Sequence, residues 1–122
     1  MRNWLFVAAI LGGLSVLCGA FAAHGLSGRL DAASLALFET AARYQMYHAL
    51  AMGLAGLLLR TTPSRQAQAA ALLFLIGTAL FCGSLYLLAF TGIKMLGAVT
   101  PLGGLAFVAG WVLLALAALK KP

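Results

Sequence analysis

The two histidines of this 122-residue chain are the residues best suited to chemistry, and both have polar neighbours. The i,i+4 spacing of Tyr44 and His48 places both on one face of an expected helix. An imidazole can ligate haem or a metal ion, and it titrates near neutral pH. Redox chemistry, metal binding and proton transfer are therefore the chemistries to consider. The candidate polar cluster comprises His24, Glu39, Arg43, Tyr44, Gln45 and His48.

The composition indicates that the elements carrying this cluster lie in a lipid bilayer. The chain is 64% hydrophobic and 8% charged, with a mean hydropathy of +1.05. A soluble domain carries roughly 25% charged residues, and disordered chains are poor in apolar residues, so both classes are excluded. The net charge of +6 comes from basic residues spread between apolar runs, which argues against nucleic acid as a partner. Cys18 and Cys82 lie inside such runs and indicate no disulfide framework.

Four apolar runs predict an all-α integral membrane protein, a compact four-helix transmembrane bundle forming a single membrane domain over 1–122. A run of about 20 residues spans the roughly 30 Å hydrocarbon layer when it is helical. Backbone polar groups in lipid must bond within their own segment, which favours helices. The expected helices cover about 5–23, 32–60, 66–90 and 101–119, with 44–59 as the membrane part of the second.

The breaks between the runs carry helix-start signals. Asp31 is typical of an N-cap for the second helix. Thr62 with Pro63, and Thr100 with Pro101, are typical of an N-cap followed by the first helical residue. The short connections predict antiparallel neighbours. Glu39 and Arg43 have the favourable acid-first i,i+4 order, which we interpret as a solvated turn at the membrane surface.

The distribution of basic residues predicts the orientation. With four spans, Arg2, Arg60, Arg65, Lys120 and Lys121 share one side of the membrane, whereas Arg29, Arg43 and Lys94 share the other. Basic residues are enriched on the cytoplasmic side. We therefore expect a multi-pass protein of the inner (plasma) membrane with both termini in the cytoplasm. The first run is longer than the apolar part of a signal peptide, so we expect it to remain as a helix.

Small residues are expected to mediate contacts between the helices, because lipid is as apolar as leucine and packing must replace the hydrophobic effect. Pairs of small residues four apart occur in all four runs. This spacing supports close helix packing and no specific partner. The predicted packing positions are Gly12, Gly13, Gly19, Gly53, Gly83, Gly103, Gly104 and Gly110.

Several short strings resemble a known family of small membrane proteins. They are GAF-x-AHGL at 19–26, YQ-x-x-HAL at 44–50, TPLGG at 100–104 and GW at 110–111. Together they are similar to the YgdD-like inner-membrane proteins, which have animal transmembrane relatives, and the resemblance covers nearly the whole chain. The first string usually has glycine where this chain has Ala22. The resemblance implies a four-helix protein of the bacterial inner membrane, and it implies neither a function nor any catalytic residue.

The favoured interpretation of the polar cluster is structural. Ionisable residues at membrane depth usually face the bundle interior and pair there, so we expect Gln45 and His48 to point inward and meet His24. We predict no catalytic residue, because no carboxylate is placed to orient a histidine, and we predict no cofactor or metal ligand. The lipid bilayer is the expected partner, together with a second copy or another membrane protein.

Three functions remain open at this point. The leading hypothesis is a non-enzymatic interaction or stabilising partner in the membrane, because a chain with so few loop residues offers little surface to soluble substrates. The alternative is a subunit of an oligomeric transporter, channel or proton relay that uses Gln45 and His48. A haem-binding or metal-binding redox component is the third hypothesis.

Overall fold

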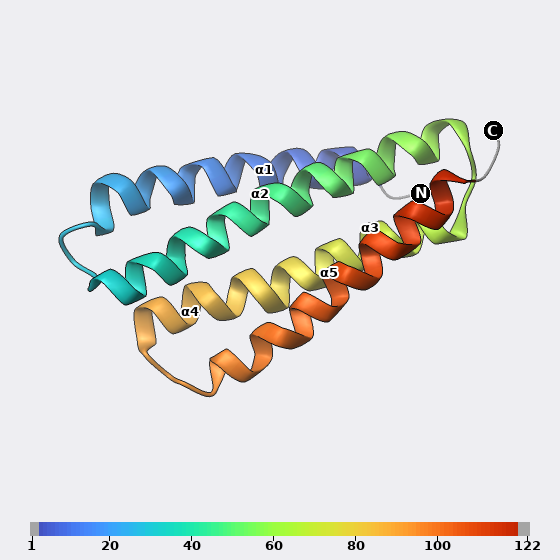
Figure 1. Ribbon diagram of the computed structural model, residues 1–122. Helices are drawn as coiled ribbons and strands as arrows, with labels where there is room; N and C mark the ends of the chain where they lie inside the picture. The colour runs from blue at the N-terminus through green and yellow to red at the C-terminus, as the bar shows by residue number, and fades with distance from the viewer. Residues whose placement is uncertain (1–2, 120–122) are drawn as a thin grey trace.

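Four long helical rods make up residues 3–119, the part of the chain that the computed structural model describes. The rods run alongside one another and are joined by short connections (Figure 1). Single π-helical turns, η1 and η2, lie at the end of the first rod and in the middle of the third. The elements in order are α1 (Trp4–Phe21), η1 (Ala22–Leu26), α2 (Ala32–Thr61), α3 (Arg65–Gly77), η2 (Thr78–Cys82), α4 (Gly83–Thr91) and α5 (Leu96–Ala118).

Three of the rods are long and apolar enough to cross a bilayer on their own. They are Trp4–Leu26, Arg65–Thr91 and Leu96–Ala118. The remaining rod, α2, is the second along the chain. It has 30 residues and is less apolar, because its first half carries most of the polar cluster. No strand occurs among residues 3–119. The predicted all-α four-helix membrane fold is confirmed, and α2 is the helix that the apolar character of the chain identifies least well.

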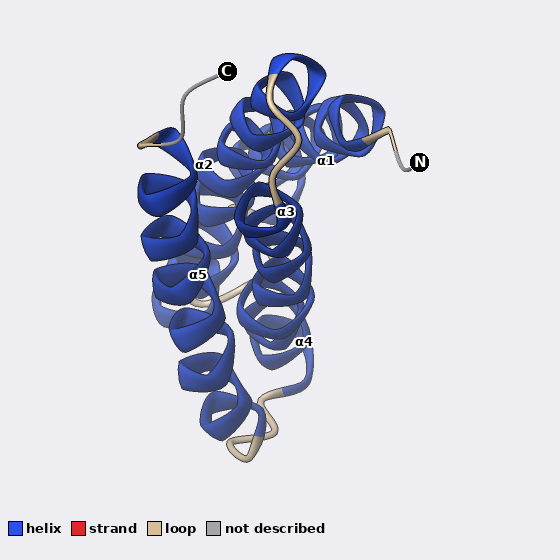
Figure 2. Cartoon of the chain, turned by 90° about the vertical axis from the view of Figure 1, so that its right-hand side faces the viewer, coloured by secondary structure: helices blue, strands red, loops and turns tan. Residues whose placement is uncertain are grey.

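The rods form two pairs. α1 packs against α2, and α5 packs against α3, η2 and α4, while α2 also contacts α3 and α4. Figure 1 shows the two pairs one above the other, and it places the start of α1 and the end of α5 at the same end as the α2–α3 connection. Figure 2 shows that helix accounts for nearly all of the described chain, with loops confined to the ends of the rods.

The connection between α2 and α3 differs from the predicted one by two residues. Thr62 is extended and caps the C-terminus of α2, where its N–H bonds to the carbonyl of Leu58 at 3.0 Å. The N-cap of α3 is Ser64, whose Oγ accepts the N–H of Ala67 at 3.1 Å. A residue before proline avoids the helical conformation, so Thr62 stays extended and Pro63 precedes the helix instead of opening it.

The prediction for the start of the last helix is also wrong. α5 begins at Leu96 and continues through Pro101. A proline in a helix lacks the hydrogen bond to the residue four before it, here Gly97 in the first turn, so the loss falls at the helix end. Thr100 serves as no cap, because its hydroxyl instead shares a 2.5 Å hydrogen bond with Ser84 of α4.

Two predicted glycines and two further ones occupy very close helix contacts. A Cβ at Gly103 would lie 2.7 Å from Cβ of Phe81, and one at Gly110 would lie 2.7 Å from Cε1 of Phe74. Gly77 faces Phe107, and Gly56 faces the backbone of α1, with Leu5 N at 3.2 Å. Gly56 and Gly77 were not predicted as packing positions, because their neighbours lie on rods far away in the chain.

The other predicted glycines are less constrained. Cβ atoms at Gly12, Gly53 and Gly104 would make ordinary contacts at 3.6–3.9 Å. Gly13, Gly19 and Gly83 have nothing within 4 Å of the Cβ position. These last three are therefore not packing positions within a single chain. The spacing of small residues does not reveal which way a helix is rotated, and therefore some glycines that were predicted to pack face away from the other rods.

Candidate functional site

Gln45 and His48 are buried in the middle of α2, where 5% and 4% of their surfaces are exposed. They point inward, as expected for polar side chains among apolar rods. However, they face different neighbours. Gln45 bonds to residues of α1 and α4, and His48 bonds to a residue of α5. The two side chains therefore belong to two separate sets of hydrogen bonds.

Gln45 joins three rods. Its Nε2 donates to the carbonyl of Leu11 in α1 at 2.8 Å, and its Oε1 accepts the hydroxyl of Tyr86 in α4 at 2.7 Å. A buried amide needs both its donor and its acceptor satisfied. The acceptor carbonyl lies in the apolar run of α1, so the side chain reaches from α2 to the backbone of a neighbouring rod. Gln45 is thereby fixed in one orientation.

His48 is held in one tautomer by two hydrogen bonds. Its Nδ1 lies 2.8 Å from the carbonyl oxygen of Tyr44. A carbonyl can only accept, so Nδ1 carries the hydrogen and Nε2 keeps the lone pair. The indole N–H of Trp111 in α5 donates to Nε2 at 3.1 Å. Both ring nitrogens of His48 are therefore engaged, and the imidazole is neutral.

Aromatic rings surround the imidazole. The ring of Phe107 is stacked on it, with centroids 3.5 Å apart and planes 5° apart, and Phe74 lies 5.7 Å away between centroids. A hollow of about 480 Å³ opens beside this group, with Tyr44, Phe81 and Trp111 in its wall. Apolar faces and fixed ring nitrogens give a rigid, uncharged site. Accepting a proton at Nε2, or ligating a metal there, would first require the loss of the Trp111 hydrogen bond.

His24 does not join the cluster, contrary to expectation. It lies exposed in η1, at the end of the first rod. His48 is sixteen residues beyond the start of α2, which places it about 24 Å along the helix axis. The sequence neighbourhood suggested proximity because the two helices are antiparallel, but the long polar start of α2 separates the two histidines.

Glu39 and Arg43 are exposed on α2, near the connection between the first two rods. No ion pair links them in residues 3–119; Arg43 Nη2 instead donates to Thr40 Oγ1 at 3.3 Å. They border a hollow of about 290 Å³ that also contains Ser15. Tyr44, 37% exposed, contributes its carbonyl to His48 and places its ring 4.8 Å from that of Phe81.

The predicted cluster is thus divided. Gln45, His48 and the backbone of Tyr44 belong to the buried centre, whereas His24, Glu39 and Arg43 face outward. Within the described chain, no three side chains among His, Cys, Asp and Glu lie close enough to hold a metal ion.

Two residues of the site were missed by the sequence analysis. Tyr86 and Trp111 complete the hydrogen bonds of Gln45 and His48, and both lie in long apolar runs. Tyrosine and tryptophan carry an O–H or N–H that needs an acceptor when buried. Because Tyr86 and Trp111 lie in apolar spans, their need for acceptors could have indicated that they bond to the side chains of Gln45 and His48.

Comparisons with known proteins give relatives over the whole chain. A family model described as "Protein of unknown function (DUF423)" matches residues 18–104. A UPF0382 membrane protein of Staphylococcus haemolyticus is 44% identical over 98% of both chains. The UPF0382 membrane protein YwdK of Bacillus subtilis is 40% identical over 98% of both chains. A UPF0382 membrane protein of Haemophilus influenzae is 41% identical over 99% of this chain and 98% of its own. No solved structure matches the chain.

Proposed function

The chain belongs to the DUF423 family of UPF0382 membrane proteins, whose function is unknown, and we propose that it acts by association within the membrane and not by catalysis. The expected occupant of its exposed surface is a second copy or another membrane protein. The proposal rests on one observation, which is that the central polar side chains are engaged in hydrogen bonds within the chain.

That observation concerns His48 and Gln45. Both ring nitrogens of His48 are engaged within the chain, and so are the Oε1 and one Nε2 hydrogen of Gln45. In residues 3–119, no buried side-chain nitrogen or oxygen lacks a hydrogen-bond partner. General acid–base and covalent catalysis require a group that can reach substrate in the correct protonation state. Side chains locked into internal hydrogen bonds instead stabilise the bundle.

The surface of α1 supports association. A shallow apolar groove of about 460 Å³ runs between α1 and α2, and it contains Ala9, Gly12, Gly13 and Gly53. The Cβ position of Gly13 is open. Small residues allow a second helix to approach closely, and packing of this kind drives helix association in lipid. A transmembrane helix of a partner would fit this groove.

The experiment is recovery of partners from membranes at native expression level in mild detergent. We expect Gly13→Leu to remove the partner, because the side chain fills the groove. Gly83→Leu is the matched control, since Gly83 is also open but lies on another rod. A wild-type protein that is strictly monomeric and recovers no partner would contradict the proposal, as would equal recovery by Gly13→Leu and wild type.

The transport, relay and redox alternatives have less support from the geometry. A common pathway would need Gln45 and His48 to line one passage, but they bond to different rods. His48→Ala separates these functions from the structural role. A structural His48 lowers thermal stability in detergent while partner recovery follows the amount of folded protein. If His48 is instead a functional group, His48→Ala should abolish transport or redox activity and leave the thermal stability unchanged.

We propose further that this chain is a YgdD-like protein of the inner membrane with both termini in the cytoplasm. One end of the bundle holds the start of α1, the end of α5 and the α2–α3 connection (Figure 1), and this connection is flanked by Arg60 of α2 and Arg65 of α3. This arrangement supports the proposed orientation. The other basic residues assigned to that side, Arg2, Lys120 and Lys121, lie outside the described residues. Reporters fused at Gly92 and at the C-terminus should report opposite sides, and an external C-terminus would overturn the orientation.

A further inference from the structure

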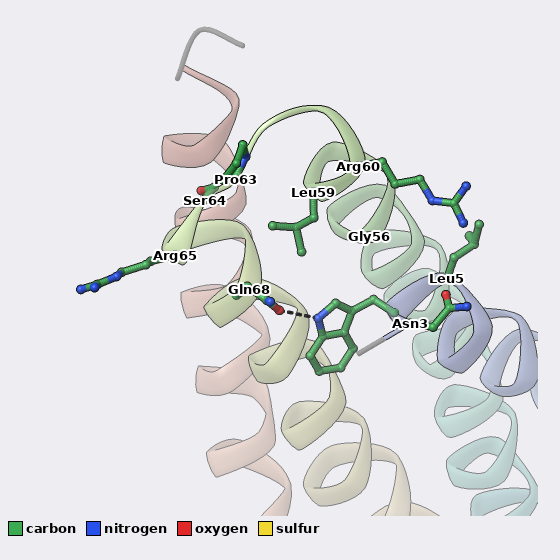
Figure 3. A pocket seen from close by; sticks show the side chains of 10 residues that line it. Asn3, Leu5, Gly56, Leu59, Arg60, Pro63, Ser64, Arg65 and Gln68 are labelled. Atoms are coloured by element: carbon green, nitrogen blue, oxygen red, sulfur yellow. Dashed lines mark hydrogen bonds between the residues drawn. The ribbon is translucent and has the colours of Figure 1, made fainter. Parts of the chain in front are cut away.

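A further cavity lies at the end of the bundle that holds the α2–α3 connection. Its volume is about 700 Å³, within the range of small-molecule sites. Its wall combines apolar side chains such as Leu5 and Leu59 with polar ones such as Ser64 and Gln68. Figure 3 shows Leu59 and Gln68 between Arg60 on one side and Arg65 on the other.

The polar part of the wall is organised by Trp4 and Gln68. The Trp4 Nε1–H donates to Gln68 Oε1 at 2.6 Å, drawn as a dashed line in Figure 3. This bond uses the acceptor of the Gln68 amide and leaves its two Nε2 hydrogens without a described acceptor. The hydroxyl of Ser64 accepts from Ala67 N and likewise retains its hydrogen for donation. Among the described residues, the wall therefore offers donors and no carboxylate.

Among residues 3–119, no acidic side chain lies near the two arginines at this end. No hydrogen bond or ion pair engages the guanidinium group of Arg60 or Arg65 within residues 3–119, and both side chains are exposed. The two acidic residues of the chain are Asp31 and Glu39. Glu39 is twenty-one residues before Arg60 on the same helix, about 30 Å along its axis. An anion is the ligand that would balance these two arginines.

The cavity also lies where apolar rods end, and thus where headgroups of a bilayer begin. Arginine binds phosphate oxygens through its fork of N–H donors. Apolar walls beneath the arginines suit hydrocarbon. We propose that this cavity binds an anionic amphiphile. Its hydrocarbon lies against Leu5 and Leu59. Its phosphate lies at the rim, where the exposed side chains of Arg60 and Arg65, which point outward in Figure 3, turn inward to bind it.

The experiment titrates purified, folded protein with phosphatidylglycerol, with phosphatidylcholine of the same acyl chains, and with inorganic phosphate, and counts bound molecules by native mass spectrometry. We expect retention of phosphatidylglycerol over phosphatidylcholine. Arg60→Gln with Arg65→Gln should weaken that binding by about 30-fold, and each single change by about 5-fold. The substitutions are at exposed positions, and circular dichroism checks that the helices persist.

The matched control removes equal charge at other exposed positions. Arg29→Gln with Arg43→Gln should leave phosphatidylglycerol binding unchanged. Equal loss in both double variants would overturn the site, because the binding would then follow net charge. Equal retention of the two lipids would overturn the preference for an anion. Binding of inorganic phosphate as strong as that of the lipid would replace the amphiphile with a free anion and overturn the proposed role of the apolar wall.

Discussion

Trp111 donates its indole N–H to Nε2 of His48 at 3.1 Å, joining two residues 63 positions apart in the chain. The bond connects α5 to α2, two rods whose backbones are close at few points, and it adds to the stacking of Phe107 on the same imidazole. It also decides the chemistry of the imidazole, because it occupies the lone pair that a proton or a metal would need. One tryptophan thus stabilises the bundle and keeps its central histidine unreactive.

Trp111→Phe should lower the free energy of unfolding by about 0.6 kcal/mol, and by no more than about 1.7 kcal/mol, the average and the largest values for hydrogen bonds between membrane helices. The substitution leaves Nε2 of His48 without its donor. Unfolding in mixed detergent micelles measures the change. Tyr47→Phe is the control, since the Tyr47 hydroxyl has no described hydrogen bond and the residue is 50% exposed. Equal effects of the two substitutions would show that the His48 bond contributes nothing.

Tyr86→Phe should destabilise the bundle by a similar amount, about 1 kcal/mol, because Oε1 of Gln45 loses its donor. Gln45→Leu removes both bonds of that amide. In a double-mutant cycle, the two substitutions should be less costly together than the sum of their separate effects, because they remove the same hydrogen bond. Strict additivity would contradict the pairing of Tyr86 with Gln45.

Gly103→Ala should destabilise the protein by about 1–3 kcal/mol, the usual cost of overpacking. Its new methyl group would lie within 2.8 Å of the Phe81 backbone, so α5 and η2 must separate. Gly13→Ala introduces the same atoms at a position with nothing within 4 Å. It should therefore leave the thermal midpoint in detergent nearly unchanged. A loss at Gly13 that matches the loss at Gly103 would contradict the observed rotation of the helices.

Asp31 should make the stability of α2 dependent on acid. Its carboxylate accepts the N–H of Ser34 at 2.7 Å, and this hydrogen bond lowers the pKa of Asp31. The contribution is complete above 3.8, the ordinary pKa, and is lost as the pH falls through the lower pKa of the folded protein. Helix content measured from pH 7 to pH 2 follows this loss.

Asp31→Asn is the matched variant, because asparagine also caps helices well and carries no charge. It should remove the acid-dependent component while retaining most of the helix at neutral pH. Asp31→Ala should destabilise the start of α2 at neutral pH. An unchanged acid profile in Asp31→Asn would show that the Asp31 carboxylate does not cause the dependence.

The apolar runs predicted the four rods, because lipid leaves an exposed backbone no partner except its own segment. The helix starts were predicted less well. Asp31 is the observed N-cap of α2, whereas Pro63 and Pro101 did not open their helices. Proline is compatible with several positions near a helix start, so its presence does not fix the first residue.

The site was predicted in part for a related reason. Helical spacing placed Tyr44 and His48 on one face, and burial of polar side chains inside the bundle was expected from their cost in lipid. The partners of Gln45 and His48 depend on how four rods are rotated against one another. That rotation follows from close contacts such as Gly103 with Phe81, and one helix at a time cannot reveal it.

The pairing of the rods has a consequence for how the chain assembles during synthesis. α1 and α2 are consecutive, and so are the α3–α4 rod and α5, so each pair can form its main interface before distant segments are made. The first hairpin can therefore enter the bilayer and fold while the second is still on the ribosome. The Trp4–Gln68 hydrogen bond joins residues of different hairpins, and it can close only when the second hairpin docks.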